Sequence, residues 1–228
     1  MTMLLHKLGL SPNLAFHDVF SIDDPDLLAF IPRPAHALLL VFPVSATFEK
    51  FKREEDQDKQ EYSGSGDGEE VVWYKQTIGN ACGLFGLLHG VSNGAARAQI
   101  QPDSELDNLI KQAVPLNPTQ RAELVEATDE LEIAHQEAAA TGDTAAPNAT
   151  DNVDLHYVCF VKSGRSGHLF EMDGSRKGPL DRGALGADED VLSAKALELG
   201  VRAFLKREEA AGGGDLRFSL IALAESLE

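Results

Sequence analysis

One cysteine of the chain lies where a nucleophile could be activated. Cys82 follows the loop residues Gly79-Asn80-Ala81 and precedes an apolar run over residues 84–89. An apolar run of this kind predicts a buried helix, so Cys82 would lie at its N-terminus. A cysteine attacks carbonyl groups as a thiolate, which a helix N-terminus and a nearby histidine both favour. Cys82 is therefore the candidate nucleophile, and an inert core thiol is the alternative.

Two histidines could serve as the general base. His156 is a polar residue within the apolar segment Leu155–Val161, which predicts a strand. His168 opens the next predicted strand, His168–Met172, which ends before Asp173. Adjacent antiparallel strands could bring Asp173 against the imidazole of His156. The residues alone leave His156 and His168 as equal candidates.

Three further residues bear on the same chemistry. Gln76 lies six positions before Cys82, and its amide could donate to an oxyanion together with the Cys82 backbone N–H. Cys159 is an odd number of positions from His156, so the two point to opposite faces of the strand and we expect Cys159 to pack in the core. We expect His89, on the apolar helix, to be a hydrogen-bonded core residue rather than a ligand.

Helical and strand-like segments surround these residues and predict a single α+β domain over residues 1–228. The sequence predicts helices over Leu4–Leu10, Glu49–Gln60, Ser104–Gln112, Pro118–His135 and Asp188–Arg207. It predicts strands over Ala37–Phe42, Leu155–Val161, His168–Met172 and Leu216–Leu223, with a further β-prone segment at Val71–Tyr74. Residues 137–152 lack apolar periodicity and are expected to form a long loop.

Composition limits the class of protein. Hydrophobic residues make up 43% of the 228 residues and charged residues 25%, which is typical of a soluble globular protein. No apolar run is long enough to span a bilayer, and the first residues do not resemble a secretory signal. With only two cysteines, neither a disulfide framework nor structural zinc is expected. We expect a cytoplasmic protein, with the nucleus as a second compartment.

The chain is strongly acidic. It carries 20 lysines and arginines against 37 aspartates and glutamates, a net charge of −17. Nucleic acids and anionic membrane surfaces would repel such a protein, so neither is an expected partner. A basic protein or peptide tail would be attracted. Solubility alone is the simpler explanation of this acidity.

Six collinear strings resemble the ubiquitin C-terminal hydrolase family. They extend over nearly the whole chain, and the one that ends in Asn80-Ala81-Cys82-Gly83 is highly specific. The strings are Leu8–Asn13, Pro32–Pro34, Lys75–Gly83, Val153–Tyr157, His168–Gly174 and Leu216–Ser219.

This resemblance implies a role for each candidate residue. Cys82 matches the nucleophile of the family, His156 the base and Asp173 the residue that orients the base. Gln76 matches the oxyanion-hole residue. Asp18 matches a carboxylate that contacts ubiquitin in relatives. His156 and Asp173 lie 17 positions apart, somewhat more than is usual, and we assign the extra length to the turn at residues 163–166.

The resemblance also implies a fold and an activity. The expected fold is that of papain-like cysteine proteases, a central antiparallel sheet flanked by helices, with a knotted topology and residues 137–152 as a crossover loop over the active site. The expected activity is cleavage of small adducts from the C-terminal glycine of ubiquitin, by a monomer that needs no metal or organic cofactor. The alternatives are a catalytically silent ubiquitin-binding scaffold of the same fold and a Cys-His-Asp acyltransferase.

Overall fold

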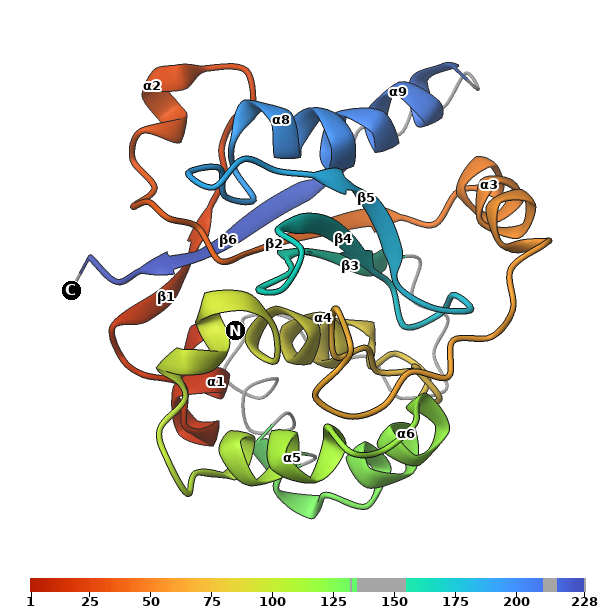
Figure 1. The fold of residues 1–228 in the computed structure, drawn as a ribbon. Coiled ribbons are helices and arrows are strands. Elements are labelled where there is room, and N and C mark those ends of the chain that lie inside the picture. The colour runs from red at the N-terminus through yellow and green to blue at the C-terminus, as the bar shows by residue number, and fades with distance from the viewer. Residues whose placement is uncertain (132, 135–154, 211–216, 228) are drawn as a thin grey trace.

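The chain forms one six-stranded antiparallel sheet (Figure 1). The computed structural model describes residues 1–131, 133–134, 155–210 and 217–227. The strand order is β1-β6-β2-β3-β4-β5. The strands are β1 (Leu14–Asp18), β2 (Ala37–Pro43), β3 (Leu155–Lys162), β4 (His168–Met172), β5 (Leu180–Ala184) and β6 (Ser219–Glu225).

Helices cover both faces of this sheet (Figure 1). One layer contains α1 (Thr2–Leu8), α4 (Cys82–Val91), the 3₁₀ turn η1 (Gly94–Gln99), α5 (Glu105–Ala113) and α6 (Pro118–Glu126). The opposite layer contains α8 (Ala194–Leu197), the π-helical turn η2 (Glu198–Arg202) and α9 (Ala203–Ala210). Outside these layers are α2 (Pro25–Leu28), which follows β1, and α3 (Ala46–Asp56), which lies at the end of the sheet where β2 leaves it. The predicted α+β class is confirmed.

The two layers explain why the central strand β2 is an unbroken apolar run. Its side chains alternate between two buried clusters, with Leu39 in the core under α4 and Leu38 and Leu40 in the core under α8 and α9. A strand covered on both faces needs no polar alternation. The sequence therefore identifies β2 as a strand although its pattern has no period of two.

The edges of the sheet were not predicted. β1 and β5 are short, and their sequences, Leu-Ala-Phe-His-Asp and Leu-Asp-Arg-Gly-Ala, mix apolar with charged residues. Each strand has only one neighbour, and its side chains are partly exposed. An edge strand of this kind carries little of the apolar signal that identifies a strand from sequence.

The helix predicted over Pro118–His135 is shorter than expected. α6 ends at Glu126, and residues 127 and 128 are not helical before a second helical stretch begins at residue 129. The Thr128 hydroxyl donates to the Leu124 carbonyl at 2.7 Å, a local side-chain bond that competes with continuation of the helix.

The segment Val71–Tyr74 is buried but is not a strand. Side chains of the helical layer satisfy its backbone instead. The Asn93 amide both accepts from the Val72 N–H at 2.7 Å and donates to the Val72 carbonyl at 3.0 Å. His89 Nε2 accepts from the Tyr74 N–H at 3.0 Å. Because a buried backbone needs partners of some kind, these side chains replace a neighbouring strand.

The predicted crossover loop at residues 137–152 lies outside the described residues. The knotted topology depends on the path of that loop, so it stays a prediction.

Arg121 also binds the irregular segment Val71–Tyr74. Its guanidinium is fully buried and donates to the carbonyls of Trp73, Ala113 and Val114, and it pairs with the buried carboxylate of Glu69. We predict that Arg121→Met lowers the free energy of unfolding by about 3–5 kcal/mol, because the Glu69 charge loses its buried partner. Urea denaturation measures this change.

The matched control is Lys111→Met, which removes an exposed cation of the same layer. Its cost should stay below about 1 kcal/mol. A loss of less than about 1 kcal/mol in Arg121→Met would contradict the structural role of this arginine.

Candidate active site

Cys82 is the first residue of α4 and lies at the positive end of its dipole. The helix begins where the Phe85 N–H donates to the Ala81 carbonyl at 3.0 Å. Its remaining positions are almost entirely buried, as the apolar run predicts. The Cys82 side chain is partly exposed, so a substrate can reach the thiol.

Glycines allow α4 to lie close to the sheet. A Cβ at Gly86 would lie 3.3 Å from Leu39 Cδ2, and one at Gly90 would lie 3.1 Å from Ala37 Cβ. Both partner residues belong to β2. Because these two helical positions lack a side chain, the helix packs on the sheet with Cys82 near the start of β3.

The predicted pairing of His156 with Asp173 is present. His156 Nε2 lies 2.9 Å from Asp173 Oδ1. Asp173 follows β4 directly, and the β3–β4 register places it opposite Val158. His156 is the diagonal neighbour two residues further along β3, a distance that a long side chain can bridge.

Asp173 is held as a carboxylate. Its side chain has no exposed surface, and Oδ1 also accepts from the backbone N–H and the hydroxyl of Ser175 at 2.9 and 2.8 Å. Burial alone would raise the pKa of Asp173. The charge and hydrogen bond of His156 and the two Ser175 bonds outweigh burial and hold this pKa well below its usual range.

His156 carries the matching positive charge. Burial acts to lower the pKa of His156, but the charge and hydrogen bond of Asp173, with a contribution from Cys82, raise it to about 9. The imidazole is therefore protonated at neutral pH. Phe42 and Phe48 enclose its ring, each with a centroid 5.8 Å away.

Cys82 lies beside the His156–Asp173 pair, and we call these three residues the Cys82 group. Its side chain lies close enough to His156 for a hydrogen bond that contributes to the raised pKa of the histidine. Its Sγ also lies 3.9 Å from the Leu155 carbonyl oxygen. Since Nε2 of His156 is occupied by Asp173, Nδ1 is the nitrogen that remains for the thiol. The structure thus brings a thiol, an imidazole and a buried carboxylate together.

Gln76 is joined to the same turn. Its backbone N–H donates to the Gly174 carbonyl at 2.9 Å, directly after Asp173. A Cβ at Gly174 would lie 2.9 Å from Gln76 Cβ, so this close approach requires glycine. The Gln76 side-chain amide donates to the Ile78 carbonyl at 3.1 Å, within the loop that leads to Cys82.

The sequence comparisons agree with this geometry. The family model "Ubiquitin carboxyl-terminal hydrolase, family 1" matches residues 1–205. The chain belongs to this family. Its members are cysteine-type deubiquitinating enzymes, and the chain is accordingly a deubiquitinating thiol hydrolase.

Several named relatives match along almost their whole length. Ubiquitin carboxyl-terminal hydrolase isozyme L1 of Monodelphis domestica is 34% identical over 225 residues, 99% of this chain and 94% of that protein. Ubiquitin carboxyl-terminal hydrolase 3 of Arabidopsis thaliana is 33% identical over 226 residues, 99% of this chain and 90% of that protein.

A solved structure shares the fold. It is the catalytic domain of Trichinella spiralis UCH37 bound to ubiquitin vinyl methyl ester, with a TM-score of 0.71 and 19% identity. The match covers 99% of this chain and 90% of that one.

Two of the remaining histidines of this ubiquitin C-terminal hydrolase, His168 and His89, lie outside the site. His168 pairs with Asp181 on the edge strand β5 at 2.8 Å, so the structure separates it from the Cys82 group. His89 is fully buried beside Tyr74, and burial lowers its pKa to about 4, as expected of a neutral core histidine. Cys159 is buried in the core on the α4 face, as predicted.

Asp18 is not part of the Cys82 group. It is the exposed last residue of β1, paired with Ile221. Three strand spacings, about 14 Å, separate β1 from β3 across the sheet. Its predicted contact with ubiquitin remains a prediction.

Ser175 and Phe48 contact the His156–Asp173 pair, and the sequence reasoning did not identify either. Ser175 could have been recognised, because a serine two residues after an aspartate commonly bonds back to that carboxylate in a turn. Phe48 lies more than a hundred positions before His156, and no local pattern connects the two.

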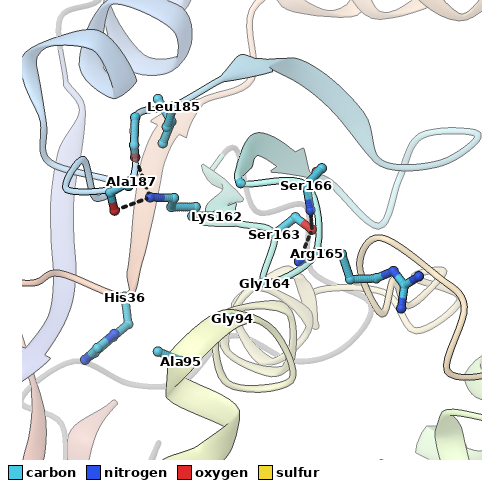
Figure 2. A pocket seen from close by; sticks show the side chains of 12 residues that line it. His36, Gly94, Ala95, Lys162, Ser163, Gly164, Arg165, Ser166, Leu185 and Ala187 are labelled. Carbon is cyan, nitrogen blue, oxygen red and sulfur yellow. Dashed lines mark hydrogen bonds between the residues drawn. The ribbon is translucent and has the colours of Figure 1, made fainter.

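A pocket of about 530 Å³ lies at the other end of β3 (Figure 2). The turn at residues 163–167 forms part of its wall. The Lys162 ammonium donates to the carbonyls of Gly186, Ala187 and Glu189. Its three hydrogen-bond donors are therefore already used by backbone groups of the protein. None of the predicted site residues lines this pocket.

Within the described part of the chain, no three or more His, Cys, Asp and Glu side chains gather as metal ligands would. No helix in those same residues combines the length and the apolar character that a membrane crossing requires.

The raised pKa of His156 leads to a prediction. We expect Asp173→Asn to lower the pKa of His156 from about 9 to below about 6.5, because burial remains while the stabilising charge is lost. NMR titration of the histidine ring measures this shift. The pair also stabilises the folded chain below pH 6.5, and this contribution is lost as the pH rises through about 9.

The control is Asp181→Asn, which removes the carboxylate beside His168. It should leave the titration of His156 unchanged. A His156 that still titrates near pH 9 in Asp173→Asn would contradict the assigned cause of the shift.

Proposed function

We propose that the chain cleaves small adducts or short peptides from the C-terminal glycine of ubiquitin, with Cys82, His156 and Asp173 as a catalytic triad. The 2.9 Å contact between His156 and Asp173, with Cys82 close enough to the imidazole to affect its pKa, is the observation that carries the proposal. A paired thiol and imidazole beside a buried carboxylate form the standard apparatus of thiol acyl transfer.

The reaction proceeds in two halves. The Cys82 thiolate attacks the carbonyl carbon of the terminal glycine, while the Cys82 backbone N–H and the Gln76 amide donate to the oxyanion. The His156 imidazolium then gives its proton to the leaving amine or thiol. In the second half, neutral His156 removes a proton from water, and the hydroxide attacks the carbonyl carbon of the thioester. The C–S bond breaks, the glycine acid leaves and loses its proton to solvent, and the Cys82 thiolate and His156 imidazolium are restored. Asp173 stabilises the imidazolium throughout.

Support for ubiquitin as the substrate comes from relatives and from charge. The Trichinella spiralis protein is bound to ubiquitin vinyl methyl ester. The net charge of −17 would draw a basic partner to the surface, and Asp18 supplies one exposed carboxylate. We also propose that the protein is a monomer, that it is located in the cytoplasm and nucleus, and that it binds neither nucleic acid nor membranes.

A silent scaffold of the same fold is the alternative. It would bind ubiquitin without reacting. The acyltransferase alternative loses its support, because the family match extends over the string that contains Gln76 and Cys82.

A ubiquitin probe with an electrophilic C-terminus distinguishes these functions. We predict rapid covalent labelling of the wild-type chain, none of Cys82→Ala, and unchanged labelling of Cys159→Ala because that thiol is buried. Mass spectrometry of the intact protein measures the adduct. Tight binding without an adduct would support the scaffold and reject the hydrolase.

Gln76 provides a second test. We predict that Gln76→Ala lowers kcat about 10²–10³-fold on ubiquitin carrying a fluorogenic C-terminal amide, because one oxyanion donor is lost. KM should change little, since the donor acts mainly on the transition state.

The exposed Gln112 of α5, which donates to the Asn108 carbonyl, provides the matched control. Gln112→Ala should retain the wild-type kcat. An unchanged kcat in Gln76→Ala would remove this residue from the oxyanion hole.

A further inference from the structure

Helix α3 contacts the His156–Asp173 pair although it lies outside both helical layers (Figure 1). The Phe48 ring packs against the His156 imidazole. Lys52 Nζ donates to Ser175 Oγ at 3.4 Å, and that hydroxyl donates in turn to Asp173. The last residues of α3, Glu55 and Asp56, reach the pair through an arginine.

That arginine is Arg176, three residues after Asp173 and almost fully buried. Its Nη2 lies 3.0 Å from Glu55 Oε2, and its Nη1 donates to Asp56 Oδ1 at 3.0 Å. Both ends of the guanidinium therefore bind α3. The remaining nitrogen, Nε, lies 3.7 Å from Glu171 Oε1 and 4.0 Å from Asp173 Oδ2.

Two buried polar atoms remain unmatched at this point. Among the residues that the structure describes, neither Arg176 Nε nor Asp173 Oδ2 has a hydrogen-bond partner, although the two atoms lie 4.0 Å apart. A buried guanidinium beside a carboxylate ordinarily forms short, charge-assisted bonds with it. The ion pairs of Glu55 and Asp56 with Nη2 and Nη1 draw the guanidinium toward α3 and so keep Nε from forming a short bond to Asp173.

We propose that Glu55 and Asp56 restrain Arg176 so that Asp173 keeps its hydrogen bond to His156. Arg176 supplies positive charge near Asp173 Oδ2 without a close bond to the carboxylate, while Oδ1 stays bonded to His156. Arg176, Glu55 and Asp56 are positioning residues, and α3 is the element that sets their place. Their effect on catalysis rests on the thiol hydrolase activity proposed above.

The surrounding charges favour the same arrangement. Arg182 pairs with both Glu55 and Glu171, so a second arginine fixes the carboxylates that flank Arg176. Glu55, Asp56, Glu171 and Asp173 thus lie around the same two arginines. The charged groups around the pair are Cys82 from α4, Glu49, Lys52, Glu55 and Asp56 from α3, Lys59 beside Asp56, Glu171 from β4, Arg176 from the turn after β4, Arg182 from β5 and Arg207 from α9.

The test is Glu55→Gln, which keeps the shape of the side chain and removes the charge. Glu55 is partly exposed and lies outside the buried apolar core, so this change leaves that core intact. We expect the freed guanidinium to turn toward Asp173, which weakens the His156–Asp173 bond. On the fluorogenic ubiquitin amide, kcat should fall about ten-fold while KM stays within about two-fold. The pKa of His156, followed by NMR titration, should fall as well.

The matched control is the neighbouring residue. Glu54→Gln makes the same chemical change on the same helix, but Glu54 is exposed, and within the described residues its one ion pair is with Lys50. It should retain the wild-type kcat and His156 titration. Asp56→Asn frees the other nitrogen of Arg176, should act in the same direction as Glu55→Gln, and keeps the test available if Glu55→Gln does not fold.

The outcomes separate this inference from the proposed function. An unchanged kcat and His156 titration in the folded variants overturns the restraint by α3. A lower kcat with an unchanged titration means that α3 acts only on structure, which also overturns it. A wild-type chain without activity rejects the hydrolase instead, and the titration, which needs no substrate, still reports whether α3 acts on His156.

Discussion

The buried contact between His156 and Asp173 is the constraint on which the rest of the site depends. A carboxylate with no exposed surface keeps its charge only because an imidazolium and the Ser175 turn stabilise it. The same charge raises the pKa of the imidazole to about 9, so the ring is protonated at neutral pH. Each partner therefore maintains the ionic form of the other, and Cys82 at the helix N-terminus completes the arrangement.

Four elements of the scaffold position this contact and the residues around it. The β3–β4 register places Asp173 diagonally from His156, and glycines in α4 allow the helix to bring Cys82 close to the sheet. The Gly174 turn joins Asp173 to the Gln76 loop. Helix α3 lies outside the main layers, yet its phenylalanine packs against His156 and its terminal carboxylates bind Arg176 beside Asp173. Catalysis on this account depends on the placement of a peripheral helix as well as on the triad.

The sequence revealed the parts of this design that depend on local pattern. The apolar run of α4 places Cys82 at a helix start, and β4 was predicted with its observed bounds. The residues alone could not choose between His156 and His168, because that choice depends on where Asp173 and Asp181 lie in space; the family resemblance made it. Edge strands β1 and β5 lack an apolar period, and Val71–Tyr74 is β-prone but takes its backbone partners from distant side chains. The sequence did not identify Arg176, because its contacts are with Glu55 and Asp56, about 120 positions earlier in the chain.

The most direct test is a crystal structure of the chain joined covalently to ubiquitin through an electrophilic C-terminus. The account predicts a bond to Cys82 Sγ, with His156 Nε2 still on Asp173 and Nδ1 within hydrogen-bond reach of the sulfur or the leaving position. The terminal carbonyl oxygen should face the Cys82 N–H and the Gln76 amide. A bond to another residue, or a His156 that has left Asp173 for a different partner, would contradict it.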